Sequence, residues 1–330
     1  MSRRTILKLL QENKGTFVSG EQISEEMGIT RAAIWKSIDG LRKEGYEIES
    51  KTKLGYRLVA SPDRATAENV GARITTRVVG QHISYFEQID STNTYAKQAA
   101  LEGGADGLVV IANEQTGGRG RSGRSFQSPP DKGLYLTALL RPQAAPADVL
   151  NITALAAVAA CNAVERVCGV RPGIKWTNDL ILNGKKLAGI LTEMGIEGES
   201  GALQYVVIGI GLNANQEPED FAEEVAEMAV SLRMALGAPV CRAALAAALI
   251  EELDALYGRL GGDLSGDLTQ YRADCVTLGR QVRILGSGAE RTGEAVDIDE
   301  SFGLVVRRAD GTEEVVRSGE VSVRGLYGYV

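Results

Sequence analysis

A short cationic, glycine-rich stretch constrains this chain more than any other feature. Residues 118–124 read Gly-Arg-Gly-Arg-Ser-Gly-Arg and show neither helical nor strand periodicity. Apolar runs at 107–112 and 133–140 flank the stretch, and each predicts a buried strand. The pattern therefore predicts a flexible loop between two core strands. Glycine lets backbone N–H groups approach an anion and arginine adds planar, bidentate charge, so the loop suits a phosphate that must be enclosed and neutralised.

The glycine spacing of this loop also matches motifs that the rest of the sequence does not support. Gly118, Gly120 and Gly123 fit G-x-G-x-x-G, but no helix is predicted after them and arginines fill the variable positions, which argues against a dinucleotide-binding fingerprint. The phosphate-binding pattern GxxxxGK[ST] is absent. A disordered, RGG-like tract that binds nucleic acid is an alternative. The two flanking strands argue against that alternative.

Length and composition indicate a multidomain globular protein. The 330 residues predict two or three domains, and 44% apolar residues provide for a substantial core. No apolar run reaches 18 residues and the N-terminus lacks a signal-peptide pattern, so we expect no membrane span and a cytoplasmic location. Four cysteines without a CxxC pair and a single histidine argue against a zinc site or a disulfide framework.

Residues 1–62 predict a winged helix-turn-helix. Helices are expected at 5–13, 20–27 and 31–44, with Ser19 and Thr30 as N-caps and a tight turn at Gly28. Segments 46–50 and 56–59 then predict a hairpin, which would form the wing. Two helices joined by a short glycine-containing turn are typical of DNA-binding modules whose second helix enters a major groove. Residues 61–63 are the expected linker.

Basic side chains lie where such a module would meet DNA. We expect DNA contacts from the second helix of the motif and from the wing, at Arg31, Lys36, Lys43, Lys51 and Lys53. Residues 1–59 carry 11 basic and 8 acidic side chains, a net charge of +3, whereas the remainder carries −10. The imbalance alone is small enough to arise by chance. A docking or dimerisation module is the alternative reading.

The central region, 63–270, contains two further groups of polar residues. Ser91, Thr92 and Asn93 precede a helix predicted at 94–101, where they suit either capping or hydrogen bonding to a polar heterocycle. The apolar segment 174–182 contains three polar residues that call for partners, namely Lys175, Asn178 and Asp179. A carboxylate such as that of Asp179 suits Mg²⁺. Lys186 begins the next predicted strand, where an ordinary surface lysine is also a valid reading.

The remaining elements predict a sheet covered by helices and then a small β domain. Asn183-Gly184 is a hairpin signal, and 205–213 predicts a buried strand that ends at Asn213. Helices are expected at 148–168, 219–236 and 241–260. The cysteines at helical spacing in the first of these are typical of core. Residues 271–330 predict short strands in a barrel of SH3-like size, with a hairpin turn at Asp310-Gly311. The predicted fold class is α+β.

Five motifs occur in order along the chain. They are Asp-Ser-Thr-Asn at 90–93, Gln-Thr-Gly-Gly-Arg-Gly-Arg-Ser-Gly-Arg at 115–124, Lys-Trp-Thr-Asn-Asp at 175–179, Lys-Leu-Ala-Gly-Ile-Leu at 186–191 and Gly-Ile-Gly-Leu-Asn at 209–213. With these motifs, the chain resembles the bifunctional biotin–protein ligase/biotin operon repressor family over nearly its whole length. One departure is Thr177, where the family usually has proline. We expect a slightly looser turn there and preserved activity.

The resemblance implies a fold and a set of ligands. The central region would be a mixed sheet similar to class II aminoacyl-tRNA synthetases. Biotin and MgATP would give biotinyl-5′-AMP, which then transfers biotin to a lysine of the biotin carboxyl carrier protein, a subunit of acetyl-CoA carboxylase. The adenylate would also act as corepressor for a homodimer that binds operator DNA.

The resemblance also implies residue roles. The site for biotin and the adenylate would be lined by Ser91, Thr92, Asn93, Gln115, Arg119, Gly120, Arg121 and Lys186. Of these, Arg121 and Lys186 would be catalytic. ATP would be bound by Gly118, Arg124, Lys175, Asn178 and Asn213, and Asp179 would hold Mg²⁺. Two alternatives share much of this pattern: a ligase for a related acid such as lipoate, and a biotin-sensing repressor without transfer activity.

Overall fold

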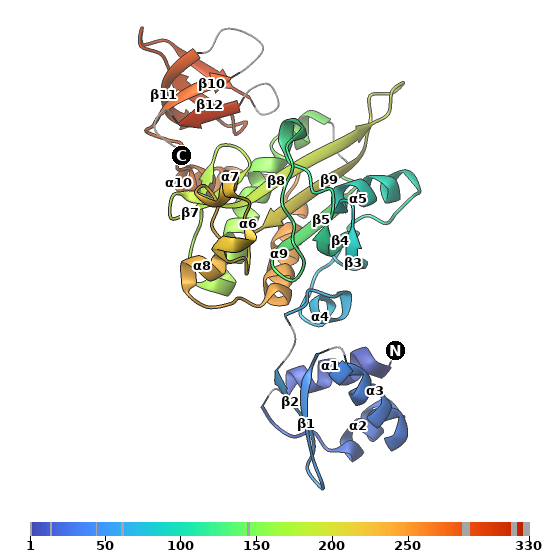
Figure 1. The fold of residues 1–330 in the computed structure, drawn as a ribbon. Coiled ribbons are helices and arrows are strands. Elements are labelled where there is room, and N and C mark those ends of the chain that lie inside the picture. The colour runs from blue at the N-terminus through green and yellow to red at the C-terminus, as the bar shows by residue number, and fades with distance from the viewer. Residues whose placement is uncertain are drawn as a thin grey trace. The chain divides into compact units, whose positions relative to one another are not determined.

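The computed structural model describes residues 2–13, 15–43, 45–60, 63–143, 146–285, 291–317 and 322–325. The chain divides into two compact units, Met1–Arg64 and Ala65–Val330 (Figure 1). Residues 61 and 62 of the expected linker, and Glu44 at the expected end of a helix, lie outside the described residues. In the described part of the chain, no helix has the length and apolar character needed to cross a membrane.

The first unit is a winged helix-turn-helix built as the sequence predicts. Its elements are α1 (Ser2–Glu12), α2 (Gly20–Met27), α3 (Arg31–Lys43), β1 (Glu47–Lys51) and β2 (Gly55–Ala60). Ser19 accepts a hydrogen bond from the Gln22 amide, and Thr30 accepts one from the Ala33 amide at 3.3 Å, so both predicted N-caps are confirmed. Gly28 follows α2 in the left-handed conformation, at a φ of 61°.

The first unit has its own hydrophobic core. Apolar side chains from all three helices and both strands meet there, among them Ile6, Leu10, Ile23, Ile34, Ile38 and Leu58. Arg42 of α3 donates hydrogen bonds to the Ile48 carbonyl and to the Ser50 hydroxyl of β1, which ties the wing to α3. The module therefore holds α3 and the wing in a fixed relation to each other.

The second unit is built on a mixed sheet of seven strands. They are β3 (Ile83–Ile89), β4 (Val109–Gln115), β5 (Leu134–Leu140), β6 (Gly173–Lys175), β7 (Asp179–Leu182), β8 (Lys185–Ile196) and β9 (Leu203–Leu212). Their order across the sheet is β3-β4-β5-β9-β8-β7-β6, in which β3 and β4 run parallel and the other neighbours run antiparallel. The predicted mixed sheet is confirmed.

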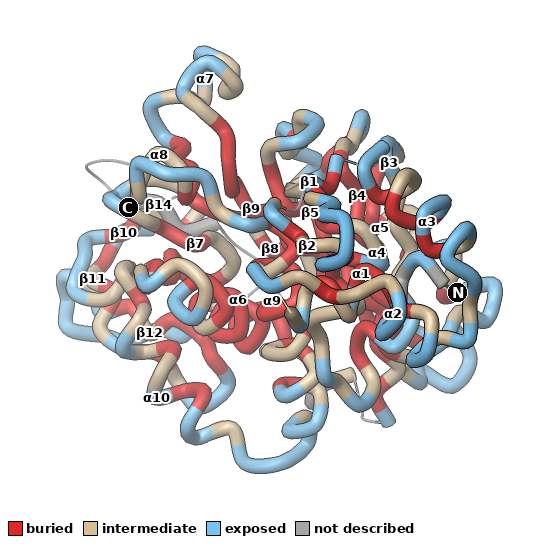
Figure 2. The backbone as a smooth tube through the Cα atoms, turned by 90° about the horizontal axis from the view of Figure 1, so that it is seen from below, coloured by how far each residue is buried: buried red, intermediate tan, exposed pale blue. Residues whose placement is uncertain are grey.

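Alternation along the strands divides the core between two faces of this sheet. Ile208 and Ile210 of β9 face the large cluster formed with helices α6 (Ile152–Cys168) and α9 (Arg242–Tyr257), whereas Val207 faces helix α5 (Thr92–Leu101). Buried residues concentrate in α6, α9 and the strands beside them (Figure 2). Because α5 is short, it covers only part of its face, and polar side chains and glycines occupy the rest.

Residues 176–178 of the apolar segment 174–182 form a turn between β6 and β7. One predicted element is wrong. The helix predicted at 219–236 is broken into a 3₁₀ turn (Pro218–Asp220), α7 (Glu223–Ala226) and α8 (Leu232–Leu236). The physical reason is tertiary pairing: the Lys186 amide donates to the Met228 carbonyl, and the Val230 amide donates to the Lys186 carbonyl. This pairing holds residues 228–230 extended against β8.

Smaller shifts occur at other helix ends. The helix predicted at 148–168 begins at Ile152, because Pro146–Val149 form a 3₁₀ turn. Short helix α4 (Ala67–Gly71) is capped by Thr66. The predicted domain boundary at residue 270 falls inside helix α10 (Ser265–Asp274), which the sequence did not predict.

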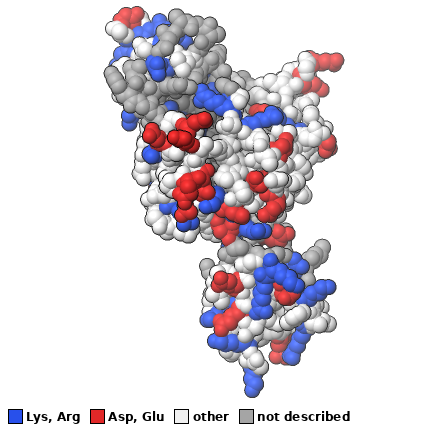
Figure 3. All heavy atoms as spheres, viewed as in Figure 1, with Lys and Arg blue, Asp and Glu red and all other residues white. Residues whose placement is uncertain are grey.

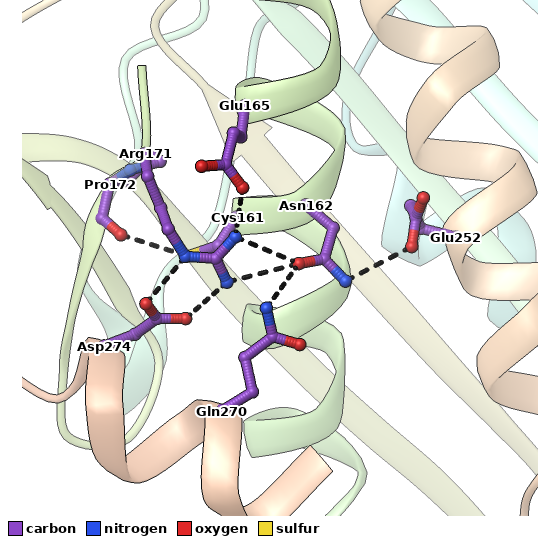
Figure 4. A network of polar contacts seen from close by, with 8 residues as sticks. All are labelled: Cys161, Asn162, Glu165, Arg171, Pro172, Glu252, Gln270 and Asp274. Atoms are coloured by element: carbon purple, nitrogen blue, oxygen red, sulfur yellow. Dashed lines mark hydrogen bonds and ion pairs between the residues drawn. The ribbon is translucent and has the colours of Figure 1, made fainter. Parts of the chain in front are cut away.

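A polar network joins α10 to α6 (Figure 4). Arg171 donates to both carboxylate oxygens of Asp274, at 2.7 and 2.6 Å, and also to Glu165 and Asn162 of α6. Gln270 of α10 donates to the same Asn162 oxygen at 3.0 Å. The network fixes the C-terminal end of α10, from which the chain enters the last group of strands.

The last strands form a five-stranded antiparallel sheet within the described residues. They are β10 (Gln281–Leu285), β11 (Arg291–Ile298), β12 (Leu304–Arg307), β13 (Glu313–Val316) and β14 (Ser322–Gly325), in the order β13-β12-β11-β10-β14. The predicted turn at Asp310-Gly311 connects β12 to β13. The Trp176 indole N–H donates to the Phe302 carbonyl at 2.9 Å, so this sheet contacts the turn between β6 and β7.

Candidate active site

A group of buried polar side chains, here called the α5 polar cluster, lies at the N-terminal end of α5. Ser91, Thr92 and Asn93 are all buried. The Thr92 amide and hydroxyl both donate to the Gln115 side-chain oxygen, at 2.9 and 3.0 Å. Ser91 is the N-cap residue, yet its hydroxyl makes no capping hydrogen bond. Side-chain capping of α5 by Ser91 is therefore not observed.

Asn93 is held in one orientation by three partners. Its amide nitrogen donates to Glu193 at 2.9 Å and to the Leu191 carbonyl at 3.2 Å, and its oxygen accepts from the Thr137 hydroxyl at 2.7 Å. Lys97 in turn donates to Glu193 at 2.6 Å. Glu193 therefore accepts from both Asn93 and Lys97, which fixes the orientation of the Asn93 amide.

The pKa of Glu193 is lowered. Burial acts to raise it, but the hydrogen bonds from Lys97 and Asn93 and the positive charge of Arg119 outweigh that effect. Glu193 is therefore a carboxylate at neutral pH. It provides the negative charge that keeps Lys97 and Asn93 in place.

Two glycines of β9 form the floor beside this network. A Cβ atom on Gly209 would lie 1.9 Å from the Asn93 side-chain oxygen, and one on Gly211 would lie 2.6 Å from the Phe126 ring. The Asn93 carboxamide and the Phe126 ring are both packed in place. A larger residue at Gly209 or Gly211 would therefore have to push one of them aside. The glycines of the 209–213 motif thus leave room for the side chains of Asn93 and Phe126.

The glycine–arginine loop is more ordered than its composition predicted. The Phe126 amide donates to the Gly118 carbonyl, and the Gly120 amide donates to the Arg124 carbonyl at 2.7 Å. Arg121–Gly123 form a 3₁₀ turn. The loop returns along itself to Ser128, which accepts a hydrogen bond from the Gln115 side chain at 2.9 Å. Residues on the two sides of the loop, Gln115 and Ser128, are thereby hydrogen-bonded to each other.

A cationic cluster joins this loop to two other motifs. Arg121 donates to the Asn178 side-chain oxygen at 3.0 Å and to the Thr177 hydroxyl at 3.2 Å. The Asn178 amide nitrogen lies 3.3 Å from the Asp179 carboxylate, and that carboxylate lies 2.7 Å from the Lys186 ammonium. Asn178 also donates to the Ile190 carbonyl, one residue before the Leu191 carbonyl that holds Asn93. Asn93 of the α5 polar cluster and Asn178 of the cationic cluster thus donate to consecutive carbonyls of β8.

The turn that carries Thr177 and Asn178 is supported from the C-terminal side of the chain. Trp176 and Thr177 are buried, and the peptide bond between them is cis. The Trp176 amide donates to the Thr277 hydroxyl at 3.0 Å, and the Tyr271 hydroxyl donates to the Thr177 carbonyl at 3.4 Å. These contacts hold the turn against the sheet.

The other predicted site residues lie in varied positions. Arg119 and Arg124 are exposed, and Gly120 is half-buried. Lys175 is buried on β6, directly opposite Asp179 in the strand register. Asn213 donates to the Val230 carbonyl at 3.2 Å and so supports the segment that pairs with Lys186. The structure therefore brings Arg121, Asn178, Asp179 and Lys186 into direct contact, but gives Arg124 no comparable side-chain contact among the described residues.

Sequence reasoning missed several residues that complete the site. They are Lys97, Ser128, Thr137 and Glu193. Thr137 and Glu193 interrupt otherwise apolar stretches of strands, and that interruption was the available signal. The assignment of the α6 cysteines to the core is confirmed for Cys161, which is buried and donates to the Pro172 carbonyl at 3.5 Å, and burial raises the pKa of its thiol. Cys168 is half-buried.

The basic residues predicted to contact DNA are exposed. Arg31 and Lys36 lie on α3, and Lys53 lies at the wing tip; these three have no ion-pair partner within the described ranges. Lys43 pairs with Asp39 at 2.8 Å, and Lys51 pairs with Glu49 at 3.2 Å. Lysine and arginine side chains are prominent over the N-terminal unit (Figure 3).

These features define a class of protein: an α/β unit with a buried polar cluster beside paired basic side chains, joined to a helix-turn-helix module. Family models match in the same order. An HTH domain matches residues 2–57, the biotin/lipoate A/B protein ligase family matches 85–213, and a biotin protein ligase C-terminal domain matches 277–324.

Individual relatives agree with these matches. The bifunctional ligase/repressor BirA of Bacillus subtilis is 39% identical over 73% of this chain and 74% of its own length. That of Escherichia coli is 31% identical over 94% of each chain. The R40G mutant of Aquifex aeolicus biotin protein ligase, solved with biotin, superposes with a TM-score of 0.65 and 25% identity over 74% of this chain and 99% of that one. The chain belongs to the family of bifunctional biotin ligase/repressors.

Proposed function

We propose that this protein is a biotin–[acetyl-CoA-carboxylase] ligase that also acts as a biotin-dependent transcriptional repressor. The observation that carries the ligase assignment is the contact chain from Arg121 through Asn178 and Asp179 to Lys186, beside the pocket of Thr92, Asn93 and Gln115. It places two cations next to a pocket whose hydrogen-bonding groups are fixed. An anionic acid that must react with a polyphosphate requires such an arrangement.

The proposed reaction has two steps. The biotin carboxylate attacks the α-phosphate of ATP, so that biotinyl-5′-AMP forms and pyrophosphate leaves. The ε-amine of a lysine on the biotin carboxyl carrier protein then attacks the carbonyl carbon of the mixed anhydride. The new amide bond forms, AMP leaves with the phosphate oxygen, and the amine loses a proton. Neither step requires a nucleophile from the enzyme.

The chain's own residues would stabilise charge and position the substrates. Arg119, Arg121 and Lys186 would neutralise the carboxylate and phosphate that approach each other, which lowers the barrier in a pocket that excludes water. Ser91, Thr92, Asn93, Gln115 and Gly120 would bind biotin and the adenylate. Gly118, Lys175, Asn178 and Asn213 would serve the ATP side. Arg124 would act there only if loop closure brings its exposed side chain inward.

The donor set around Asp179 does not fit a resident Mg²⁺. One Asp179 oxygen is 2.7 Å from the Lys186 ammonium, and that positive charge would repel a cation at the same oxygen. Among the described residues, no group of three or more His, Cys, Asp or Glu side chains is arranged to hold a metal. We therefore assign Asp179 to orienting Lys186, and Mg²⁺ would enter with ATP, bound mainly by its phosphates.

The repressor function would use the first unit. Biotinyl-5′-AMP would act as corepressor by binding the dimer-competent state more tightly, and a two-fold dimer would bind a palindromic operator. Arg31, Lys36 and Lys53 are available for phosphate contacts. Lys43 and Lys51 would have to exchange their acidic partners for phosphates.

Finer features of the molecule belong to the same proposal. We infer the three-part division predicted from the sequence, 1–62, 63–270 and 271–330, with the last boundary moved past α10 to residue 274. The central fold would be similar to class II aminoacyl-tRNA synthetases, and the C-terminal part would be an SH3-like barrel. Cytoplasmic location remains a prediction from the sequence.

The ligase proposal is tested by ATP–pyrophosphate exchange that depends on biotin. We expect Lys186→Ala and Arg121→Ala each to lower the exchange rate about 10²–10³-fold, because each removes a positive charge from the reacting anions. Lys185→Ala is the matched control, since it removes the neighbouring lysine and leaves the Asp179–Lys186 pair in place. Wild-type exchange in both site variants would refute the assignment.

Substrate and product are tested with the same preparation. Exchange with lipoate but not biotin would establish the lipoate alternative. Operator binding without biotinylation of the carrier would establish a repressor that lacks transfer activity.

A further inference from the structure

The recognition helix of the first unit exposes a tryptophan to solvent. Trp35 of α3 is 60% exposed, whereas the second tryptophan of the chain, Trp176, is 4% exposed. The apolar face of α3 is used by Ile34, Ile38 and Leu41, which are buried in the core of the unit. The indole of Trp35 is thus not needed for that core, although leaving such a large apolar group in water is unfavourable.

The surroundings of Trp35 are polar rather than apolar. Arg31 lies one helical turn before it on the same face, and Lys36 follows it directly on an adjacent face; both are exposed and without an ion-pair partner in the described part of the chain. Asp39 lies one turn after Trp35, and its carboxylate is paired with Lys43 at 2.8 Å. Among the large apolar side chains described as exposed, Trp35 is the one from α3. A protein-binding surface would present a contiguous apolar patch. A single aromatic ring near exposed basic side chains fits a polyanion with apolar groups instead.

The position of Trp35 within the motif specifies which part of that polyanion it meets. In a helix-turn-helix the N-terminal residues of the second helix contact base edges, while neighbouring basic side chains bind phosphates. Trp35 is the fifth residue of α3, within the half of the helix that begins at Arg31. The apolar group on a base edge in the major groove is the C5-methyl group of thymine.

We propose that Trp35 is a specificity-determining residue of the operator complex, in which its indole packs against a thymine methyl group in the major groove. Arg31 and Lys36 hold the backbone on either side of that base. The proposal rests on the repressor function and adds to it a preference for thymine at one position of each half-site.

The test compares operators with and without the methyl group. A duplex is first selected from a random library by the full-length wild-type protein with biotin and ATP, and each thymine is then replaced in turn by deoxyuridine. We expect one position per half-site at which this replacement weakens wild-type binding about fivefold or more. Trp35→Ala should bind the thymine and deoxyuridine duplexes equally at that position.

Two control variants separate base contact from general attraction. Lys36→Ala should weaken binding to every duplex and lower the salt dependence, while keeping the response to deoxyuridine. Trp35→Phe should retain part of that response. Circular dichroism of Trp35→Ala checks that α3 stays folded, as expected because the ring lies outside the core.

Each result has a distinct meaning. If the wild type selects no sequence, the repressor proposal fails. If it selects an operator but Trp35→Ala shows the same deoxyuridine response, the repressor stands and the role of Trp35 is overturned. If biotin and ATP shield the indole from acrylamide quenching before DNA is added, Trp35 lies in a protein interface, and the proposal is likewise overturned.

Discussion

Thr177 links the glycine–arginine loop to the segment proposed to bind ATP. Its hydroxyl accepts a hydrogen bond from Arg121, a contact that proline could not provide. The departure from the usual family residue thus changes more than the turn. It adds a second anchor for the arginine that we place beside the reacting phosphate.

Replacing Thr177 by valine tests this contact, because valine keeps the shape and removes the hydroxyl. Loss of one hydrogen bond to a charged donor costs about 1 kcal/mol at a partly exposed site, so we expect the KM for ATP to rise about fivefold while the melting temperature stays near that of the wild type. Thr177→Ser should restore the KM. An unchanged KM in Thr177→Val would show that Arg121 does not depend on this hydroxyl.

In the proposed biotin site, Glu193 would act on biotin through Asn93. We expect Glu193→Gln to raise the KM for biotin about tenfold with little change in kcat, because Asn93 and Lys97 lose their charged partner. Since the pKa of Glu193 is lowered in the folded protein, its contribution is complete above the ordinary glutamate range and is lost as the pH falls through the lowered pKa. When the KM for biotin is measured at decreasing pH from pH 8, the ratio between Glu193→Gln and the wild type should stay constant at first. That ratio should shrink only in acid. A difference that disappears near neutral pH would contradict this role.

The hydrogen-bond partners of the site residues could not be predicted from the sequence. The family resemblance indicated Asn93, Arg121 and Lys186 as site residues, although the local sequence at Lys186 fits an ordinary surface lysine equally. The resemblance did not indicate their partners: Glu193 is 100 residues from Asn93, and Asn178 is 57 residues from Arg121. Such pairings depend on strand order, which local patterns do not contain.

At the scale of elements, strand β9 runs beneath the proposed biotin site, with Gly209 against Asn93 and Gly211 against Phe126. We expect Gly209→Ala to reduce biotin affinity about 10²-fold, because the added methyl group would displace the Asn93 carboxamide by an ångström or more. Gly198→Ala, in the turn of the same β8–β9 hairpin, is the control, since a Cβ there meets no atom within 4 Å. Isothermal titration with biotin measures both. Equal affinity in the two variants would place the biotin pocket elsewhere.

Elements buried on both faces were predicted well, because their apolar runs are continuous. This holds for β4, β5 and β9. The contacts that hold the turn at 176–178 could not be predicted, because they come from Tyr271, Thr277 and Phe302, far along the chain. The helix predicted at 219–236 failed for the same reason, since pairing with Lys186 overrides its helical pattern.

At the scale of the whole molecule, the two proposed activities share one small molecule. We expect biotin and ATP together to shift the protein from monomer to dimer in sedimentation velocity and to raise operator affinity in parallel, because the adenylate binds the dimer-competent state more tightly. Biotin with a non-hydrolysable ATP analogue blocked at the α–β bridge should do neither. Equal operator affinity with and without the substrates would remove the coupling.

The two units each bury their own apolar residues: one core is built around Ile23 and Ile38, the other around α6 and α9. Loss or exchange of the first unit would therefore open no cavity in the second. In evolutionary terms, a lineage can discard transcriptional control, or acquire a different DNA module, without compensating changes in the ligase interior. Enzymes with and without this module are expected to share the same residues around Asn93 and Lys186. They should differ mainly at the surfaces through which adenylate binding would promote dimerisation.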